Sequence, residues 1–213
     1  FYRWKRKYGG LGKAELQRVY SVSLQAMVLG RIDPARYRDR IAECGRFLVE
    51  SQHANGQWSY GRPLVNVPVT KATEAFHYGN NSCSAFAALG LRACSEAGFK
   101  VPRETLERAS QWWRESQHRE GERGGWCYRR NEPSHRSYAS MTACGLGSVV
   151  LLDGLMGKDW RADPVASAGV NWLARYFTVM ENFGPVEDLM VKEMESDAVN
   201  PMTEFYFCLW ALE

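Results

Sequence analysis

The sequence has no long uninterrupted hydrophobic run and no strong excess of charge of either sign. Its apolar stretches are too short to cross a membrane, and no segment reads as a signal peptide. The formal net charge of +3 at pH 7 is too small to indicate a nucleic-acid partner. The sequence therefore predicts no transmembrane segment in this part of the protein and no nucleic-acid ligand.

Motifs for metal or cofactor chemistry are also absent. No C-x-x-C pair, H-E-x-x-H helix, phosphate-binding glycine loop or Ser–His–Asp order occurs, so the sequence predicts neither a metal site nor a cofactor. The six cysteines are Cys44, Cys83, Cys94, Cys127, Cys144 and Cys208. Four of them lie within apolar helical stretches, where a free thiol packs as a small hydrophobe. This favours a cytoplasmic location, and an exported or membrane-associated one stays open because we take the natural N-terminus to be missing.

Two helices of contrasting character occupy the centre of the chain. Residues 81–97 leave almost no polar face, which predicts a helix buried on nearly all sides. Gly98 provides a C-terminal stop, and Pro102 suits the first position of the next helix. In residues 102–117, apolar side chains recur at helical spacing and charged ones fill the other face. The pattern predicts an antiparallel hairpin in which an amphipathic outer helix covers a buried inner helix.

The same unit occurs more than once along the chain. The motifs that repeat are Ser51-Gln52-His53 with Gly56-Gln57-Trp58-Ser59-Tyr60, and Ser116-Gln117-His118 with Gly124-Gly125-Trp126-Cys127-Tyr128. Residues 165–177 form a third, degenerate outer copy without the Gln and the glycine–Trp loop. The inner segments align at 24–29, 86–91, 144–149 and 207–212. A repeat of roughly 60 residues predicts inner and outer helices that alternate along the chain.

This repeat sets the expected helices. Inner helices are expected over 14–30, 81–97, 135–152 and 201–213, and outer helices over 34–52, 102–117 and 165–177. Asp33-Pro34 and Asp163-Pro164 are expected to open two outer helices as N-cap and first position. The predicted class is all-α, with about three and a half helical hairpins in one domain.

The Gln–Trp loops resemble the Gln–Trp repeats of squalene–hopene and oxidosqualene cyclases, whose fold the protein prenyltransferase β subunits share. Residues 20–27, 80–87 and 140–146 resemble prenyltransferase/squalene oxidase repeat proteins of a bacterial, planctomycete-type group. The resemblance covers residues 16–213 and implies an α/α toroid, here incomplete, whose inner helices line a central cavity. It also implies that the Gln amide caps a helix end while the Trp ring stacks beneath it and staples neighbouring hairpins.

The resemblance nominates site residues. The structural loop residues are Gln52, Gly56, Trp58, Gln117, Gly125 and Trp126. Polar residues near the N-terminal ends of inner helices are expected to face the cavity, namely Tyr20, Asn80, Asn81, Ser84, Tyr138, Thr142 and Glu204. Lys71 and His77, in the long connection over 61–79 at the expected cavity mouth, are further pocket candidates.

The catalytic groups of the family are not found in this sequence. Hopene-type cyclases open an inner helix with Asp-x-Asp-Asp-Thr, whose carboxylic acid protonates the substrate. At such a position only Glu204 is acidic, which makes it the one catalytic candidate. Glu193, Glu195 and Asp197 form an acidic string ahead of the last helix, which we interpret as a solvated loop. The Asp-x-Cys zinc pair of protein prenyltransferases is absent.

Two segments outside the helices need an interpretation. Residues 1–12 are basic and aromatic, and we interpret them as the end of a preceding repeat rather than as a membrane or nucleic-acid contact. Residues 13–213 form the repeat domain, interpreted as a fragment of a longer chain whose remainder completes the toroid. The arginine-rich loop over 119–135 is interpreted as a solvated, self-paired loop, with a pyrophosphate-type anion site as the alternative.

Two functions are consistent with this sequence. One is a terpenoid cyclase-like toroid that binds an apolar, isoprenoid ligand or a peptide in its cavity without a recognisable catalytic group. The other is an enzyme of isoprenoid metabolism, a squalene cyclase-like isomerase or a prenyltransferase, whose catalytic residues lie outside this segment. Fold alone does not decide between them, because one fold hosts many functions.

Overall fold

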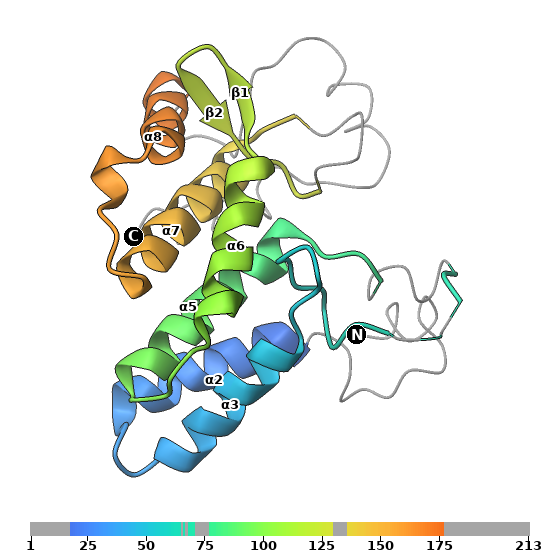
Figure 1. The fold of residues 1–213 in the computed structure, drawn as a ribbon, viewed down its shortest axis with the longest axis vertical. Coiled ribbons are helices and arrows are strands. Elements are labelled where there is room, and N and C mark those ends of the chain that lie inside the picture. Colours follow the sequence, from blue (N-terminus) through green and yellow to red (C-terminus); the bar gives the residue numbers. More distant parts are fainter. Residues whose placement is uncertain (1–17, 65, 67, 71–76, 130–135, 177–213) are drawn as a thin grey trace. The chain divides into compact units, whose positions relative to one another are not determined.

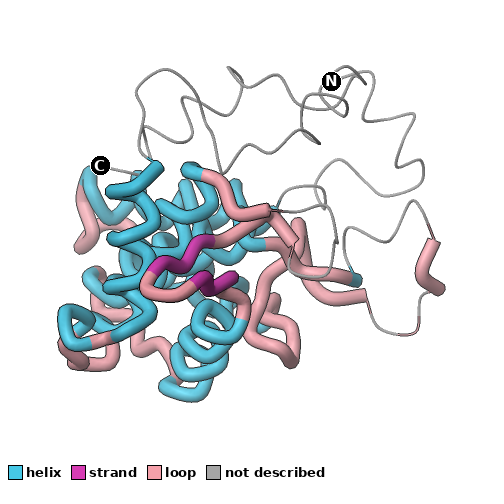
Figure 2. The backbone as a smooth tube through the Cα atoms, turned by 90° about the horizontal axis from the view of Figure 1, so that it is seen from above, coloured by secondary structure: helices cyan, strands magenta, loops and turns pink. Residues whose placement is uncertain are grey.

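The computed structural model describes residues 18–64, 66, 68–70, 77–129 and 136–176. Its helices are α2 (Arg18–Ile32), α3 (Arg38–Glu50), α5 (Asn81–Glu96), α6 (Arg103–Glu115), α7 (Ala139–Leu155), α8 (Pro164–Tyr176) and the short 3-10 helix η1 (Trp160–Ala162) (Figure 1). The sheet in the described part is one antiparallel pair, β1 (His118–Glu120) with β2 (Arg123–Gly125) (Figure 2). The prediction of an all-α chain is confirmed for these residues, among which no helix is long and apolar enough to cross a membrane.

The chain divides into two compact units whose boundary lies between Trp112 and Trp113, inside α6. In the first unit, α2 packs along α5, and α3 contacts both. Ala26, Ile41, Cys44 and Cys94 form a buried cluster where the three helices meet. A Cβ on Gly90 would lie 2.9 Å from the Cα of Ser23, so α2 and α5 approach this closely only because position 90 has no side chain.

Helix α5 begins and ends where its sequence predicts. The side chain of Asn80 accepts a hydrogen bond from the Cys83 N–H at 2.8 Å, which caps the first turn. Gly98 has a φ of +92° and ends the helix in the left-handed conformation. Outer helix α8 begins at Pro164, and the Asp163 carboxylate accepts from the Val165 N–H at 2.7 Å, as the Asp-Pro pattern predicts.

In the second unit, α7 packs against α8, and β2 contacts both helices. Arg114, near the end of α6, donates to both oxygens of the buried Asp153 at 2.9 Å and also to Asp163. One guanidinium therefore joins α6, α7 and the start of α8, and it supplies the charge that a buried carboxylate needs. Five described cysteines, Cys44, Cys83, Cys94, Cys127 and Cys144, are buried thiols that form no disulfide with one another, as the sequence predicts.

Three expectations were wrong in detail. Residues 34–37 form a separate turn in which the Asp33 carboxylate accepts from Arg36 N–H, so the first outer helix begins at Arg38 rather than at Pro34. The third inner helix was expected over 135–152 but spans Ala139–Leu155. The glycine loop before Trp126 contains the β1–β2 hairpin. The expectations for residues 1–17, 179–200 and 201–213 lie outside the described residues.

Candidate functional site

The first Gln–Trp loop, residues 52–58, joins three helices through five hydrogen bonds, and we call it the first loop staple. The Gln52 amide nitrogen donates to the Gly56 carbonyl at 3.2 Å and to the Thr105 carbonyl in the first turn of α6 at 3.0 Å. The Trp58 indole donates to the Leu48 carbonyl of α3 at 2.7 Å.

The same staple also fixes the start of α5. The Trp58 backbone N–H donates to the Ser84 hydroxyl at 3.0 Å, and the Trp58 carbonyl accepts from the Asn80 N–H at 2.9 Å. Trp58 is fully buried, and Gln52 is 9% exposed. Each bond therefore satisfies a polar group that burial would otherwise leave without a partner.

The second loop staple, residues 117–126, repeats these five bonds. Their pairs are Gln117 amide to Gly124 carbonyl at 3.3 Å, Gln117 amide to Val165 carbonyl at 2.9 Å, Trp126 indole to Trp113 carbonyl at 2.9 Å, Trp126 N–H to Thr142 hydroxyl at 3.2 Å, and Tyr138 N–H to Trp126 carbonyl at 3.1 Å. Each partner occupies the place of its counterpart in the first staple, on an outer helix, the loop or the next inner helix. The repeated motif thus forms a repeated structure.

The two staples differ at the oxygen of the Gln side chain. In the first, Nε and Nη2 of Arg108 donate to Gln52 Oε1 at 3.1 and 2.8 Å. Counted from the accepting carbonyls of Thr105 and Val165, the counterpart of Arg108 is Ala168. Gln117 Oε1 is buried without a hydrogen-bond partner. The first staple therefore has a charge-assisted contact that the second lacks.

The structure gives the predicted site residues specific partners. Ser84 and Thr142 accept from the two Trp N–H groups, and Asn81 accepts from the Trp112 indole at 2.8 Å. Asn80 and Tyr138 occupy equivalent N-cap positions of α5 and α7. These contacts hold the helix starts in place, and the role of the residues in lining a cavity stays a prediction. Glu204 and Lys71 lie outside the described residues.

Tyr20 belongs to a small cluster on the inner helices of the first unit. Its hydroxyl lies 2.7 Å from the Ser82 hydroxyl, and its ring meets Phe86 edge-on with centroids 4.8 Å apart. Burial, with a smaller contribution from Cys83, raises the pKa of Tyr20, so the hydroxyl stays neutral. A neutral phenol held by one hydroxyl partner can position a polar group of a ligand, but it is a poor acid.

On α2, Tyr20 and the half-buried Met27 face away from the outer helix α3. On α2, Gln25 accepts a hydrogen bond from the Cys44 thiol of α3, and Val22 and Leu29 pack on the buried cluster that contains Ile41 and Cys44 of α3. Tyr20 and Met27 lie about half a turn from these positions. With the half-buried Phe86 and Leu89 of α5, they form what we call the ligand face, defined as Tyr20, Met27, Phe86 and Leu89.

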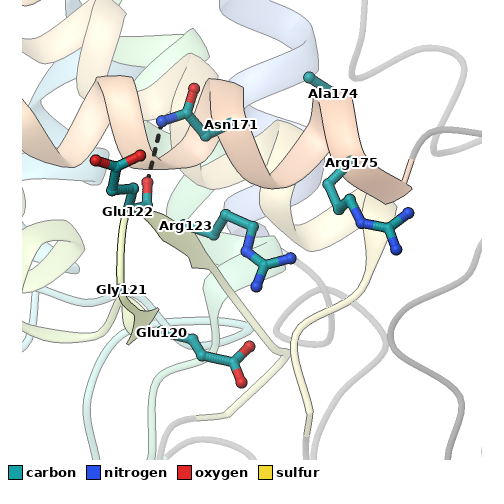
Figure 3. A pocket seen from close by; sticks show the side chains of 7 residues that line it. All are labelled: Glu120, Gly121, Glu122, Arg123, Asn171, Ala174 and Arg175. Atoms are coloured by element: carbon teal, nitrogen blue, oxygen red, sulfur yellow. Dashed lines mark hydrogen bonds between the residues drawn. The ribbon is translucent and has the colours of Figure 1, made fainter.

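A separate open hollow lies in the second unit, between the β-hairpin and the last turns of α8 (Figure 3). It has a volume of about 540 Å³, and its lining residues are Glu120, Gly121, Glu122, Arg123, Asn171, Ala174 and Arg175. Asn171 donates to the Glu122 carbonyl at 3.1 Å across it. The arginines Arg123 and Arg175 each lie over the Tyr176 ring. None of the cavity-lining residues nominated from the sequence lines this hollow, but Arg123 belongs to the loop over 119–135 for which an anion site was the alternative.

Several partners in the staples were missed by sequence reasoning. The accepting carbonyls of Leu48, Thr105, Trp113 and Val165 are backbone groups, which leave no mark on residue type. Gly124, rather than the nominated Gly125, supplies the loop carbonyl of the second staple. Gly125 is required for a different reason, because a Cβ there would lie 2.6 Å from the Ser137 side chain. The sequence holds one indication of these partners, because Ser84 and Thr142 both carry a hydroxyl at the equivalent position of their inner helices.

Comparisons with known proteins give no family for this chain. No family model matches it, and no curated protein matches it significantly. Among the described residues no group of three or more His, Cys, Asp or Glu side chains is arranged to hold a metal ion. The two loop staples and the ligand face are therefore the features of this structure that bear on function.

Proposed function

We propose that this chain is part of an α/α toroid-type repeat protein whose inner helices α2 and α5 bind an apolar ligand, an isoprenoid or an apolar peptide. The observation that carries the proposal is the recurrence of the same five hydrogen bonds in both loop staples. Each staple ties an outer helix to the next outer and inner helices, so successive hairpins repeat one geometry. Stacked repeats of this kind build concave binding surfaces.

The ligand face supports the apolar character of the ligand. Tyr20, Met27, Phe86 and Leu89 are half-buried and predominantly apolar, and the two on α2 are turned away from the outer helix α3. Pockets for small molecules combine such a lining with a few placed polar groups. The paired hydroxyls of Tyr20 and Ser82 supply one such group beside the Phe86 ring.

In the described residues, the first turns of α2, α5 and α7 contain no acidic side chain. A cyclase that starts its reaction by protonation needs a carboxylic acid beside the substrate. We therefore assign binding, rather than acid catalysis, to the described starts of α2 and α5. The alternative of an isoprenoid-metabolising enzyme would need its acid on another part of the protein.

Thermal shift measurements with farnesyl, geranylgeranyl and squalene analogues test the proposal. A ligand that binds the native state at one hundred times its Kd stabilises it by about 2.7 kcal/mol, which raises the Tm by several degrees. We expect this shift for the natural sequence and for Val170→Glu, a matched control on α8 at a 45% exposed apolar side chain. We expect its loss in Met27→Glu and in Leu89→Glu. An isoprenoid or apolar peptide shift that survives both substitutions, or no shift with any ligand, contradicts the proposal.

A further inference from the structure

Arg123 and Arg175 meet at one aromatic ring beside the hollow of the second unit. Arg123 lies on β2 and Arg175 in the last turn of α8, and their guanidinium carbons are 5.8 and 5.6 Å from the centroid of the Tyr176 ring. A guanidinium that lies over a ring keeps its in-plane N–H groups for other acceptors. The ring therefore holds two positive charges at the lining of the hollow and leaves their donors available.

Arg123 does not pair with the carboxylate that the hairpin places opposite it. Glu120 is its direct partner in the β1–β2 register, a position at which opposite charges stabilise a sheet. No ion pair joins the two, and among the described residues neither Arg123 nor Arg175 forms an ion pair with any carboxylate. Arg123 is therefore a half-buried cation that does not make the self-pairing expected of this loop.

The hollow also carries two carboxylates that lack a cationic partner. Glu120 and Glu122 line it, are exposed, and form no ion pair with another described residue. In Figure 3 the Glu122 carboxylate points to the opposite side from the two guanidinium groups, whereas that of Glu120 extends below Arg123. A purely anionic ligand would be repelled by Glu120, and a purely cationic one by the arginines.

From these unpaired charges of both signs we infer that the hollow binds a small zwitterion, with a phosphate group against Arg123 and Arg175 and an ammonium group against Glu120. Guanidinium groups bind phosphate oxygens through parallel hydrogen bonds, and two of them match the nearly dianionic charge of a phosphate monoester. Opposite residues in an antiparallel pair have Cβ atoms about 5 Å apart, which suits ligand charges separated by a few bonds. The site uses no residue of the ligand face, so it is independent of the proposed function.

Nitrogen–proton correlation NMR of the full chain, titrated at constant low ionic strength, tests the site. The zwitterion probe is O-phosphoethanolamine, and inorganic phosphate and ethanolamine represent its anionic and cationic halves. We expect saturable shifts of the Arg123 and Arg175 Nε–H signals and of the Gly121 amide. The zwitterion should bind about fivefold more tightly than phosphate, the upper value for one exposed ion pair. Ethanolamine alone should give no saturable shift, and β-alanine, with a carboxylate in place of the phosphate, should bind more weakly than O-phosphoethanolamine.

Substitutions at the hollow separate the two halves of the site. Arg123→Met, which keeps an apolar stem over the ring, and Arg175→Gln should each weaken binding of both O-phosphoethanolamine and phosphate. Glu120→Gln should weaken binding of the zwitterion and strengthen binding of phosphate, so that the two affinities become equal. The matched control is Arg161→Gln, which removes an arginine that lies over the Trp160 ring outside the hollow and should leave every affinity unchanged.

A second control and the fold of each variant come from the same spectra. Glu122→Gln should leave binding unchanged, because its carboxylate points away from the two guanidinium groups. Absence of a saturable shift with every probe overturns the inference, as do shifts that survive both arginine substitutions in folded protein. Phosphate or β-alanine that binds the natural sequence as tightly as O-phosphoethanolamine contradicts the phosphate zwitterion, and so does a Glu120→Gln variant that binds it unchanged.

Discussion

The fold shifts the acid–base equilibrium of His53 within the range of mild acid. Its backbone N–H donates to the Gln57 carbonyl at 2.8 Å inside the first loop staple. The Nε2 atoms of His53 and His77 are both buried without a hydrogen-bond partner. Burial, and secondarily the nearby His77, lower the pKa of His53 to about 4.

This shift predicts a loss of stability in acid. The folded-state pKa lies below the unfolded value of about 6.5, so between pH 6.5 and 4 the unfolded chain binds a proton that the folded chain does not. Unfolding free energy should be constant above pH 6.5 and fall by up to about 3 kcal/mol as the pH drops to 4. Denaturant titrations across this range, with His53→Gln as the comparison, measure it. Parallel pH profiles for the two proteins would contradict the assignment.

Residue-level sequence reading found several important side chains but not their partners. Ser84 and Thr142 were nominated because polar residues at helix starts suit a cavity, yet both accept hydrogen bonds from buried Trp N–H groups. The sequence analysis assigned no role to Arg108, because an arginine on the charged face of a helix is usually exposed to solvent. Arg108 donates to Oε1 of Gln52, a residue that lies 56 positions away in the sequence. A single sequence contains no information about such a pairing.

At the level of elements, local sequence patterns predicted the helix boundaries well where capping residues determine them. α5 and α8 begin within one residue of the expected positions, because Asn80, Gly98 and the Asp163-Pro164 pair act on their immediate neighbours. The start of α7 was missed because Tyr138 N–H bonds to the Trp126 carbonyl, which holds the chain extended until Ala139. Because this contact joins residues from different elements, no local sequence pattern predicts it.

Two glycines of α7 give a matched test of how this element packs. A Cβ on Gly145 would overlap the buried Trp126 indole, which is rigid and held by the hydrogen bond from its Nε1 to the Trp113 carbonyl. A Cβ on Gly147 would meet nothing within 4 Å. We expect Gly145→Ala to cost about 1–3 kcal/mol through overpacking. We expect Gly147→Ala to stabilise the protein by about 0.5–1 kcal/mol, since glycine is a poor helix former.

Urea unfolding midpoints of the two variants measure these effects within one helix, two residues apart. Equal destabilisation by both substitutions would mean that α7 tolerates no added methyl group anywhere. Equal stabilisation would mean that the Trp126 ring moves aside without cost, and that the second staple is loosely packed.

At the level of the whole molecule, α6 takes part in both loop staples. Its first turn supplies the Thr105 carbonyl and, one turn later, Arg108 to the first staple. Its last turns supply the Trp113 carbonyl to the second staple, and Gln117 follows directly after the helix. The boundary between the two compact units falls inside this helix. Folding of the two units should therefore be coupled through the continuity of α6.

A proline in the middle of α6 tests that coupling. Glu107→Pro, at an exposed position, removes a helical hydrogen bond and costs about 3 kcal/mol or more. The backbone amides of Trp58 and Trp126 report on the two staples, because each donates to a buried hydroxyl. We expect faster hydrogen exchange at both amides, and at Trp126 alone when the proline is placed in α8 as Val170→Pro. Glu107→Ala, which removes only an exposed ion pair with Arg103, should leave both unchanged. Exchange at Trp126 that is unaffected by Glu107→Pro would show that the second unit keeps its staple without an intact α6.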